Sequence, residues 1–116
     1  MKRRKIILTD TKRNPLRKIK TTVVNEVFAI HGTILSWPGY AYDGKTSVSR
    51  KDYTLTHIPT GAAVVQNRTK DTLIRAAKKL MELGNWDFTD PDMATELFDT
   101  KRVMAIIDES QIPNLL

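Results

Sequence analysis

The chain contains no cysteine and only two histidines, His31 and His57. The absence of cysteine excludes disulfide bridges and zinc sites built from thiolates, and it fits a reducing compartment such as the cytoplasm. Both histidines fall on expected strands, where a histidine is more often packed or exposed than bound to a metal. We therefore expect no metal ion and no cofactor.

Long apolar runs and catalytic motifs are also missing. The basic start of the chain is followed by only three apolar residues, Ile6–Leu8, which is too short for a signal peptide or a membrane span. No phosphate-binding glycine loop, nucleophile elbow or Glu-x-x-His spacing occurs. These absences predict a cytoplasmic protein that does not act on membranes and is not an enzyme.

Charge is plentiful but uneven. The formal net charge is +6, and nine lysines and arginines lie in the first twenty residues with one acid, Asp10. From Asp87 onward seven acids are opposed only by Lys101 and Arg102. This division favours an anionic partner at one end or contacts between copies of the chain. A solvated basic arm that only aids solubility is the simpler alternative.

Residue patterns predict strands first and helices later. Alternating and β-branched runs favour strands at Arg4–Thr9, Arg17–Val24, Glu26–Leu35, Lys51–His57 and Ala62–Gln66. Helical spacing of apolar residues begins after Thr69, an expected N-cap, and Gly84 is the expected left-handed terminator. We expect an α+β fold, with an antiparallel sheet of about five strands followed by two or three C-terminal helices on one side. Residues 1–116 would form a single domain, with 1–66 mostly β and 67–110 mostly helical.

Three segments leave alternatives open. Ser36–Arg50 reads as a loop whose Trp37, Tyr40 and Tyr42 either cover a sheet edge or subunit contact, or stack on a ligand ring. A second helix is expected after Asp90 as its cap, with Pro91 as its first residue. Val103–Asp108 fits a strand or a helix, and a helix is favoured. A sheet covered on one face only would expose apolar residues, which indicates an oligomer.

Binding residues are expected at the corner Gly84–Phe88 and among the arginines. A bend after Gly84 would present Asn85, Trp86 and Phe88 together, so that an amide reads a base edge while a ring stacks on it. Alternatively, Trp86 and Phe88 anchor the second helix to the core. Arginine forks suit phosphate, and the candidates for this role are Arg13, Arg17, Arg68, Arg75 and Arg102. Arg102 is isolated among acids, where a surface ion pair with Asp99 or Glu96 is the alternative.

The layout "YTLTHIPTGAAV", then a basic helix, then "NWDF" and "DPD", resembles the phage Thoeris anti-defence sponge family. The resemblance covers about Lys5 to Ile107. It implies a non-catalytic bacteriophage protein that sequesters a cyclic ADP-ribose-type nucleotide in the host cytoplasm, as a homodimer or a larger homo-oligomer such as a hexamer. Asn85, Trp86 or Phe88, and Arg102 would then hold the ligand, with Arg13 or Arg17 supplied by the partner chain.

Two further functions remain open from the residues. The basic N-terminal segment and the aromatic loop also fit a small nucleic-acid-binding phage regulator, although no known nucleic-acid-binding motif is present. The acidic last third of the chain would repel a phosphate backbone. A protein that inhibits a host enzyme by direct contact is the third hypothesis.

Overall fold

The structure is a computed structural model that describes residues 2–9, 15–36, 47–90 and 92–111, with side chains for residues 3, 21–33, 49–90 and 92–111. Its elements are β1 (Lys2–Thr9), β2 (Pro15–Val24), β3 (Phe28–Ser36), β4 (Ser47–His57), β5 (Ala62–Arg68), α1 (Lys70–Leu80), a 3₁₀ turn (Met81–Leu83), α2 (Met93–Leu97) and α3 (Thr100–Ser110). The expected α+β class, with strands first and helices last, is confirmed.

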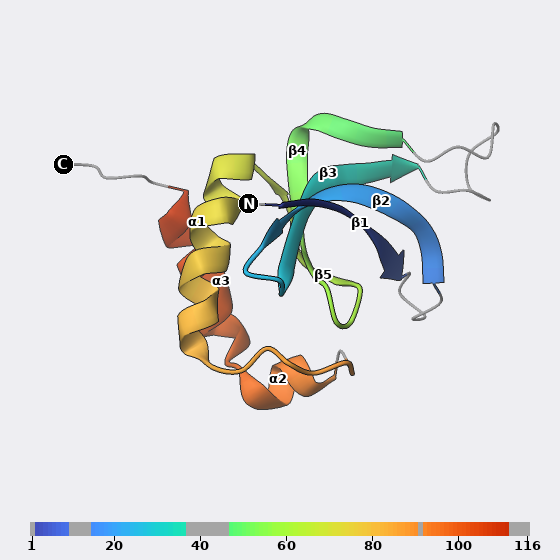
Figure 1. The fold of residues 1–116 in the computed structure, drawn as a ribbon. Helices are drawn as coiled ribbons and strands as arrows, with labels where there is room; N and C mark the ends of the chain where they lie inside the picture. Colours follow the sequence, from blue (N-terminus) through green and yellow to red (C-terminus); the bar gives the residue numbers. More distant parts are fainter. Residues whose placement is uncertain (1, 10–14, 37–46, 91, 112–116) are drawn as a thin grey trace.

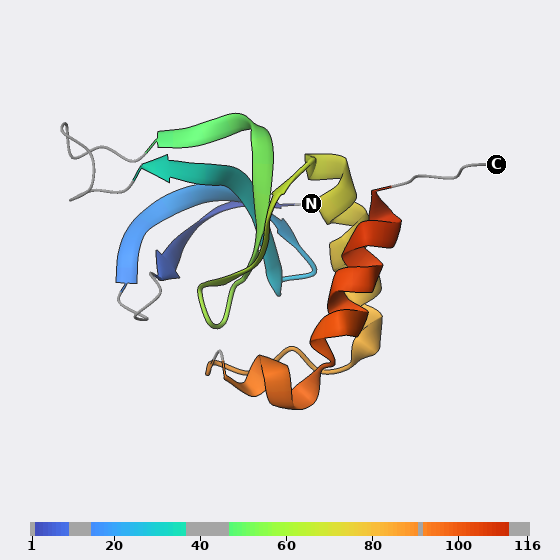
Figure 2. The same ribbon diagram turned by 180° about the vertical axis from the view of Figure 1, so that it is seen from behind.

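The five strands form one antiparallel sheet in the order β1-β2-β3-β4-β5, so each strand pairs with its neighbour in the sequence. The sheet is strongly curved, and α1 and α3 lie side by side next to it while α2 crosses below (Figure 1). The reverse view shows α3 in front of α1, with the β4–β5 turn pointing toward α2 (Figure 2).

Two turns of the sheet follow from local sequence. Asn25 and Glu26 both have positive φ, 54° and 61°, and Val27 N donates to Val24 O at 3.3 Å. This is the arrangement of a two-residue type I′ hairpin turn, which suits the twist of the flanking strands. Gly61, with φ 72°, closes the β4–β5 turn.

One face of the sheet packs against the helices. Phe28, Ile30 and Leu55 have at most 2% of their surface exposed and belong to the same core cluster as α1 and α3. The helices contribute a buried apolar stripe, made of Leu73, Ala76, Ala77 and Leu80 from α1 and Ile106 and Ile107 from α3. The helical spacing of that stripe in α1 is the pattern that predicted the helix.

The opposite face of β3 and β4 is buried but polar. His31 Nε2 accepts a hydrogen bond from Thr56 Oγ1 at 2.8 Å, and Thr33 and Thr54 share another at 2.9 Å. These bonds offset the cost of burying the polar groups. Since the described residues of this face are buried, the expected exposed apolar face is not found among them. The oligomer stays a prediction, because most side chains of β1 and β2 lie outside the described set.

Several element boundaries differ from the expected ones. Ser47–Arg50 lies in β4 rather than in a loop, because it continues the pairing with β3. Trp37, Tyr40 and Tyr42 lie outside the described residues. The segment around Val103–Asp108 is helical, as favoured, because Asp99 caps α3 by accepting from Lys101 N at 3.0 Å.

The second helix begins at Met93, and its N-cap is Asp92 rather than the expected Asp90. Asp90 Oδ1 does accept from Asp92 N at 3.0 Å, just before the helix. Pro91, expected as the first helical residue, lies outside the described residues. None of the helices in the described ranges is long and apolar enough to cross a membrane.

Candidate functional site: an aromatic pocket

A cavity of about 220 Å³ opens between the β4–β5 hairpin and the helices α2 and α3. Its rings come from His57, Trp86, Phe88 and Phe98, and its hydroxyl groups come from Thr60, Thr95 and Thr100. Small or apolar side chains complete the lining: Ala62, Ala63, Val64, Ala94, Val103 and Met104. None of these described lining residues carries a formal charge. We call this cavity the aromatic pocket.

Trp86 is a fixed wall of the aromatic pocket. Only 4% of its surface is exposed, and its indole Nε1–H donates to Leu80 O at 2.7 Å. Its ring stacks on Phe98, with centroids 4.0 Å apart and planes 13° apart, and meets Phe28 edge-on at 5.0 Å. The structure therefore places Trp86 in the core, which was the alternative to a freely accessible stacking ring.

His57 joins the hairpin to the Trp86 segment. Its Nε2 lies 2.6 Å from Trp86 O, and a carbonyl oxygen can only accept, so Nε2 carries the hydrogen. Its Nδ1 lies 2.9 Å from Thr60 Oγ1, which therefore donates to the neutral ring. Burial lowers the pKa of His57 below the ordinary 6.5, and the hydrogen bond to Trp86 works in the opposite direction.

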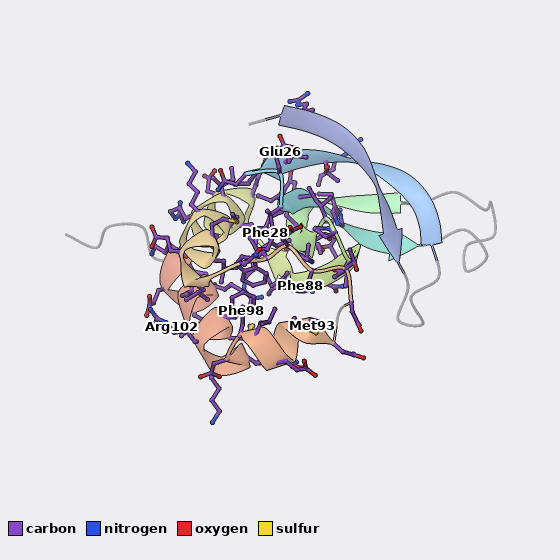
Figure 3. The ribbon with its side chains drawn as sticks, turned by 60° about the horizontal axis from the view of Figure 1, so that its bottom comes forward. Glu26, Phe28, Phe88, Met93, Phe98 and Arg102 are labelled. Carbon is purple, nitrogen blue, oxygen red and sulfur yellow. The ribbon has the colours of Figure 1, made fainter. Side chains whose placement is uncertain are left out.

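Phe88 is the most accessible of the expected aromatic residues. It is half-buried and stacks on His57, with ring centroids 4.5 Å apart and planes 27° apart. The view from below shows Phe28, Phe88 and Phe98 gathered between the sheet and the α2 segment (Figure 3). Of the predicted aromatic pair, Phe88 rather than Trp86 is placed to meet a ligand ring.

Asn85 lies on the other side of the same bend. It is exposed, and its Oδ1 accepts from Asp87 N at 2.8 Å, a local turn that the short side chain stabilises. Asn85 and Phe88 line a second cavity of about 310 Å³, whereas Trp86 and Phe88 line the aromatic pocket. The predicted Asn-Trp-Phe corner is therefore one structural unit, but it faces two cavities.

The expected arginines are not brought to the aromatic pocket within the described structure. Arg102 is exposed, and α3 presents Thr100, Val103 and Met104 to the pocket instead. At ~100° per residue Arg102 points away from that side, and Figure 3 shows it at the outer edge of the helix. No ion pair of Arg102 with Asp99 or Glu96 is found in the described part of the chain either.

The other expected arginines are placed less completely. Arg17 lies in β2, but its side chain is outside the described set, and Arg13 is outside the described residues altogether. Arg68 and Arg75 lie at the far end of the helices, where Arg75 Nε donates to Ser110 O at 2.9 Å and Arg68 lies 4.0 Å from the Asp108 carboxylate. Neither Arg68 nor Arg75 lines the aromatic pocket.

Sequence reasoning missed three residues of the site, namely His57, Thr60 and Phe98. His57 was considered as a packed or exposed strand residue, or less often as a metal ligand, but not as part of a binding pocket. The signal that was available is the spacing His57-x-x-Thr60 across a Pro-Gly turn, which brings the hydroxyl onto the ring.

Comparisons of the chain with protein-family models, with curated proteins and with solved structures found no match.

Proposed function

We propose that this is a non-catalytic phage anti-defence protein that binds a cyclic ADP-ribose-type nucleotide and so withholds the signal from host Thoeris immunity. The observation that carries the proposal is the aromatic pocket itself, in which Phe88 and Phe98 line a neutral cavity edged by hydroxyl groups. Flat uncharged rings such as nucleobases are stabilised by stacking on aromatic side chains. The resemblance to the sponge family supplies the class of nucleotide.

The size of the aromatic pocket limits which part of the nucleotide enters. Sites for drug-sized ligands span about 300–1,000 Å³, and this cavity of about 220 Å³ is smaller. A base would fit, while the ribose and phosphate groups would stay outside. The described lining has no cation, so the phosphates would lie outside the pocket, and arginines such as Arg13, Arg17 or Arg102 would reach them only from a second copy in a homo-oligomer.

The hydrogen bonds of His57 support binding without chemistry. A general base needs a ring nitrogen within reach of the substrate proton. Both ring nitrogens of His57 are already engaged, one with Trp86 O and the other with Thr60 Oγ1. A ligand in the aromatic pocket would meet the face of the ring and no free nitrogen.

The proposal predicts that filling the aromatic pocket abolishes binding. Ala94 lines the pocket, and Ala94→Leu would occupy part of its volume without weakening the helix, because leucine is a good helix former. Isothermal titration with cyclic ADP-ribose and its glycocyclic isomers should show at least a tenfold loss of affinity, about 1.4 kcal/mol or more.

The matched control is Glu96→Leu, which adds the same side chain to an exposed position of α2 outside both cavities. It should bind like the original chain. Equal affinity of Ala94→Leu and Glu96→Leu would exclude the aromatic pocket as the site. Chromatography of the recovered nucleotide should show it unaltered, and a converted product would overturn the non-catalytic part of the proposal.

A second candidate function, nucleic-acid binding, is favoured by the register of the first two strands. Lys5 pairs with Lys20, so two cationic residues occupy opposite positions on the edge strand β1 and its neighbour β2. Like charges opposite one another destabilise a strand pair, and an anionic backbone would offset that cost. Removing residues 1–5 would cut β1 in half, so charge-neutralising substitutions test this better than a truncation.

The double variant Lys5→Gln/Lys20→Gln should bind DNA and RNA more weakly if this second function holds. Anisotropy titrations between about 50 and 200 mM salt should show the slope of log affinity against log salt shrinking by about two, since each phosphate contact contributes about one. Lys78→Gln/Lys79→Gln removes the same charge from exposed positions of α1. Equal slopes for the two double variants would exclude the β1–β2 edge as a nucleic-acid site.

A further inference from the structure

The second cavity shares a wall with the aromatic pocket. It measures about 310 Å³ and lies between the bend Gly84–Phe88 and α2, with Asn85, Asp87 and Met93 in its lining. Phe88 and Phe98 line both cavities, and their ring centroids are 6.3 Å apart. Two aromatic rings therefore separate the cavities, which together reach the size typical of a small-molecule site.

Phe88 belongs to a stretch, residues 84–90, that is neither helix nor strand, and its half-buried ring lines both cavities. Its neighbour Trp86 is held by hydrogen bonds at both its indole nitrogen and its carbonyl oxygen. A ligand can thus contact Phe88 from either side while Trp86 keeps the backbone in position.

The two cavities differ in chemistry. The aromatic pocket has no charged lining residue, whereas the second cavity carries the Asp87 carboxylate and the Asn85 amide. Asp92 immediately precedes the nearby α2 helix and Glu96 lies within it, and both residues are exposed. This cavity would repel a phosphate and suits a group that donates hydrogen bonds. A carboxylate accepts from the two hydroxyls of a ribose, as an acid does in dinucleotide-binding folds.

We propose that the two cavities form one nucleoside site, with the base in the aromatic pocket, the ribose hydroxyls on Asp87 and Asn85, and any phosphate directed to solvent. This inference rests on the proposed function and deepens it. It attributes most of the binding free energy to contacts with the nucleoside rather than with the phosphates. It also assigns Asp87, which no sequence pattern had singled out for binding, as the residue that selects ribose.

The test combines a charge-neutral variant with a ligand that lacks the hydroxyls. Adenosine and 2′,3′-dideoxyadenosine are titrated into the original chain, into Asp87→Asn, and into Glu96→Gln as the control for loss of one exposed negative charge. The original chain should bind adenosine about tenfold more tightly than the dideoxy compound, the loss expected for a hydrogen bond to a charged group. Asp87→Asn should lose that preference, and Glu96→Gln should keep it.

The outcomes separate this inference from the proposed function. If Asp87→Asn keeps the preference for adenosine, or if the original chain has none, the nucleoside site is wrong, while the pocket-filling result with Ala94→Leu still stands for the proposed function. If neither adenosine nor cyclic ADP-ribose binds the original chain, both proposals fail. Circular dichroism of Asp87→Asn, whose side chain is exposed, should show an unchanged fold.

Discussion

Gly84 shows how one residue controls the shape of the site. Its φ of 157° and ψ of −155° are conformations that residues with a Cβ rarely adopt. The sequence predicted a left-handed helix terminator here. The structure instead places Gly84 after the 3₁₀ turn Met81–Leu83, with the chain nearly extended. A Cβ at this position would lie 3.3 Å from Phe98 Cε1, so glycine also makes room for the ring.

We therefore predict that Gly84→Ala destabilises the fold by about 1–3 kcal/mol, from the strained dihedral and the contact with Phe98. Urea denaturation measures the change in the free energy of unfolding. Glu82→Ala, an exposed substitution two residues earlier, should change it by less than about 0.5 kcal/mol. A Gly84→Ala variant as stable as Glu82→Ala would mean that the backbone relaxes around the new methyl group.

The two possible roles of Trp86 could not be separated from sequence. Its hydrogen bond joins the indole to Leu80 O, six residues earlier, and forms only because the 3₁₀ turn brings the chain back beneath α1. Its stacking partner, Phe98, is the residue that follows α2 in the chain. Neither contact has a periodic signature, so the sequence indicated an aromatic corner and left open which ring faces the ligand.

At the scale of elements, periodicity predicted most of the fold. The β4–β5 hairpin and α1 follow from alternation, from a turn that contains Pro and Gly, and from an apolar stripe with a Thr69 cap, which does accept from Thr72 N at 3.2 Å. The segment α3 satisfied both periods, because Val103 and Ile107 suit either. The Asp99 cap and packing against α1 select the helix.

The aromatic pocket could not be predicted at this scale. It forms where α3 and the short α2 approach the end of the β4–β5 hairpin, and that approach is a tertiary contact without a local signal. The same contact explains the failure of Arg102 as a pocket residue. Thr100 and Val103 line the pocket, and helical spacing from them places Arg102 on the opposite side of α3. The sequence did not show which side of α3 would face the pocket.

For the molecule as a whole, the charge division expected from sequence has a structural counterpart. The described basic residues of the N-terminal segment fall on the edge strand β1 and its neighbour β2, while exposed Asp87, Asp90 and Glu96 lie around α2. The candidate pocket is at the acidic end. The proposed nucleoside site would therefore bind a neutral ring and ribose at the acidic end, while the basic strands would be available to an anionic group.

The stability of the whole chain should depend on pH through both histidines. Burial lowers the pKa of His31 and of His57 below the ordinary 6.5, although backbone hydrogen bonds to Gly32 and Trp86 oppose the shift. Above pH 6.5 both rings are neutral whether the chain is folded or unfolded. Below pH 6.5 the histidines of the unfolded chain become protonated while those of the folded chain stay largely neutral. The folded state therefore loses stability as the pH falls toward the lowered pKa values.

We predict that the free energy of unfolding, measured with urea, falls between pH 7.5 and pH 5 by up to about 1.4 kcal/mol per pH unit for each histidine. His31→Gln and His57→Gln should each remove part of that slope, whatever their effect at pH 7.5. The two rings lie on opposite faces of the sheet, so their contributions should add. A stability that stays flat over this range in the original chain, or ring titrations near 6.5 by NMR, would show that the folded protein accepts the imidazolium at both positions.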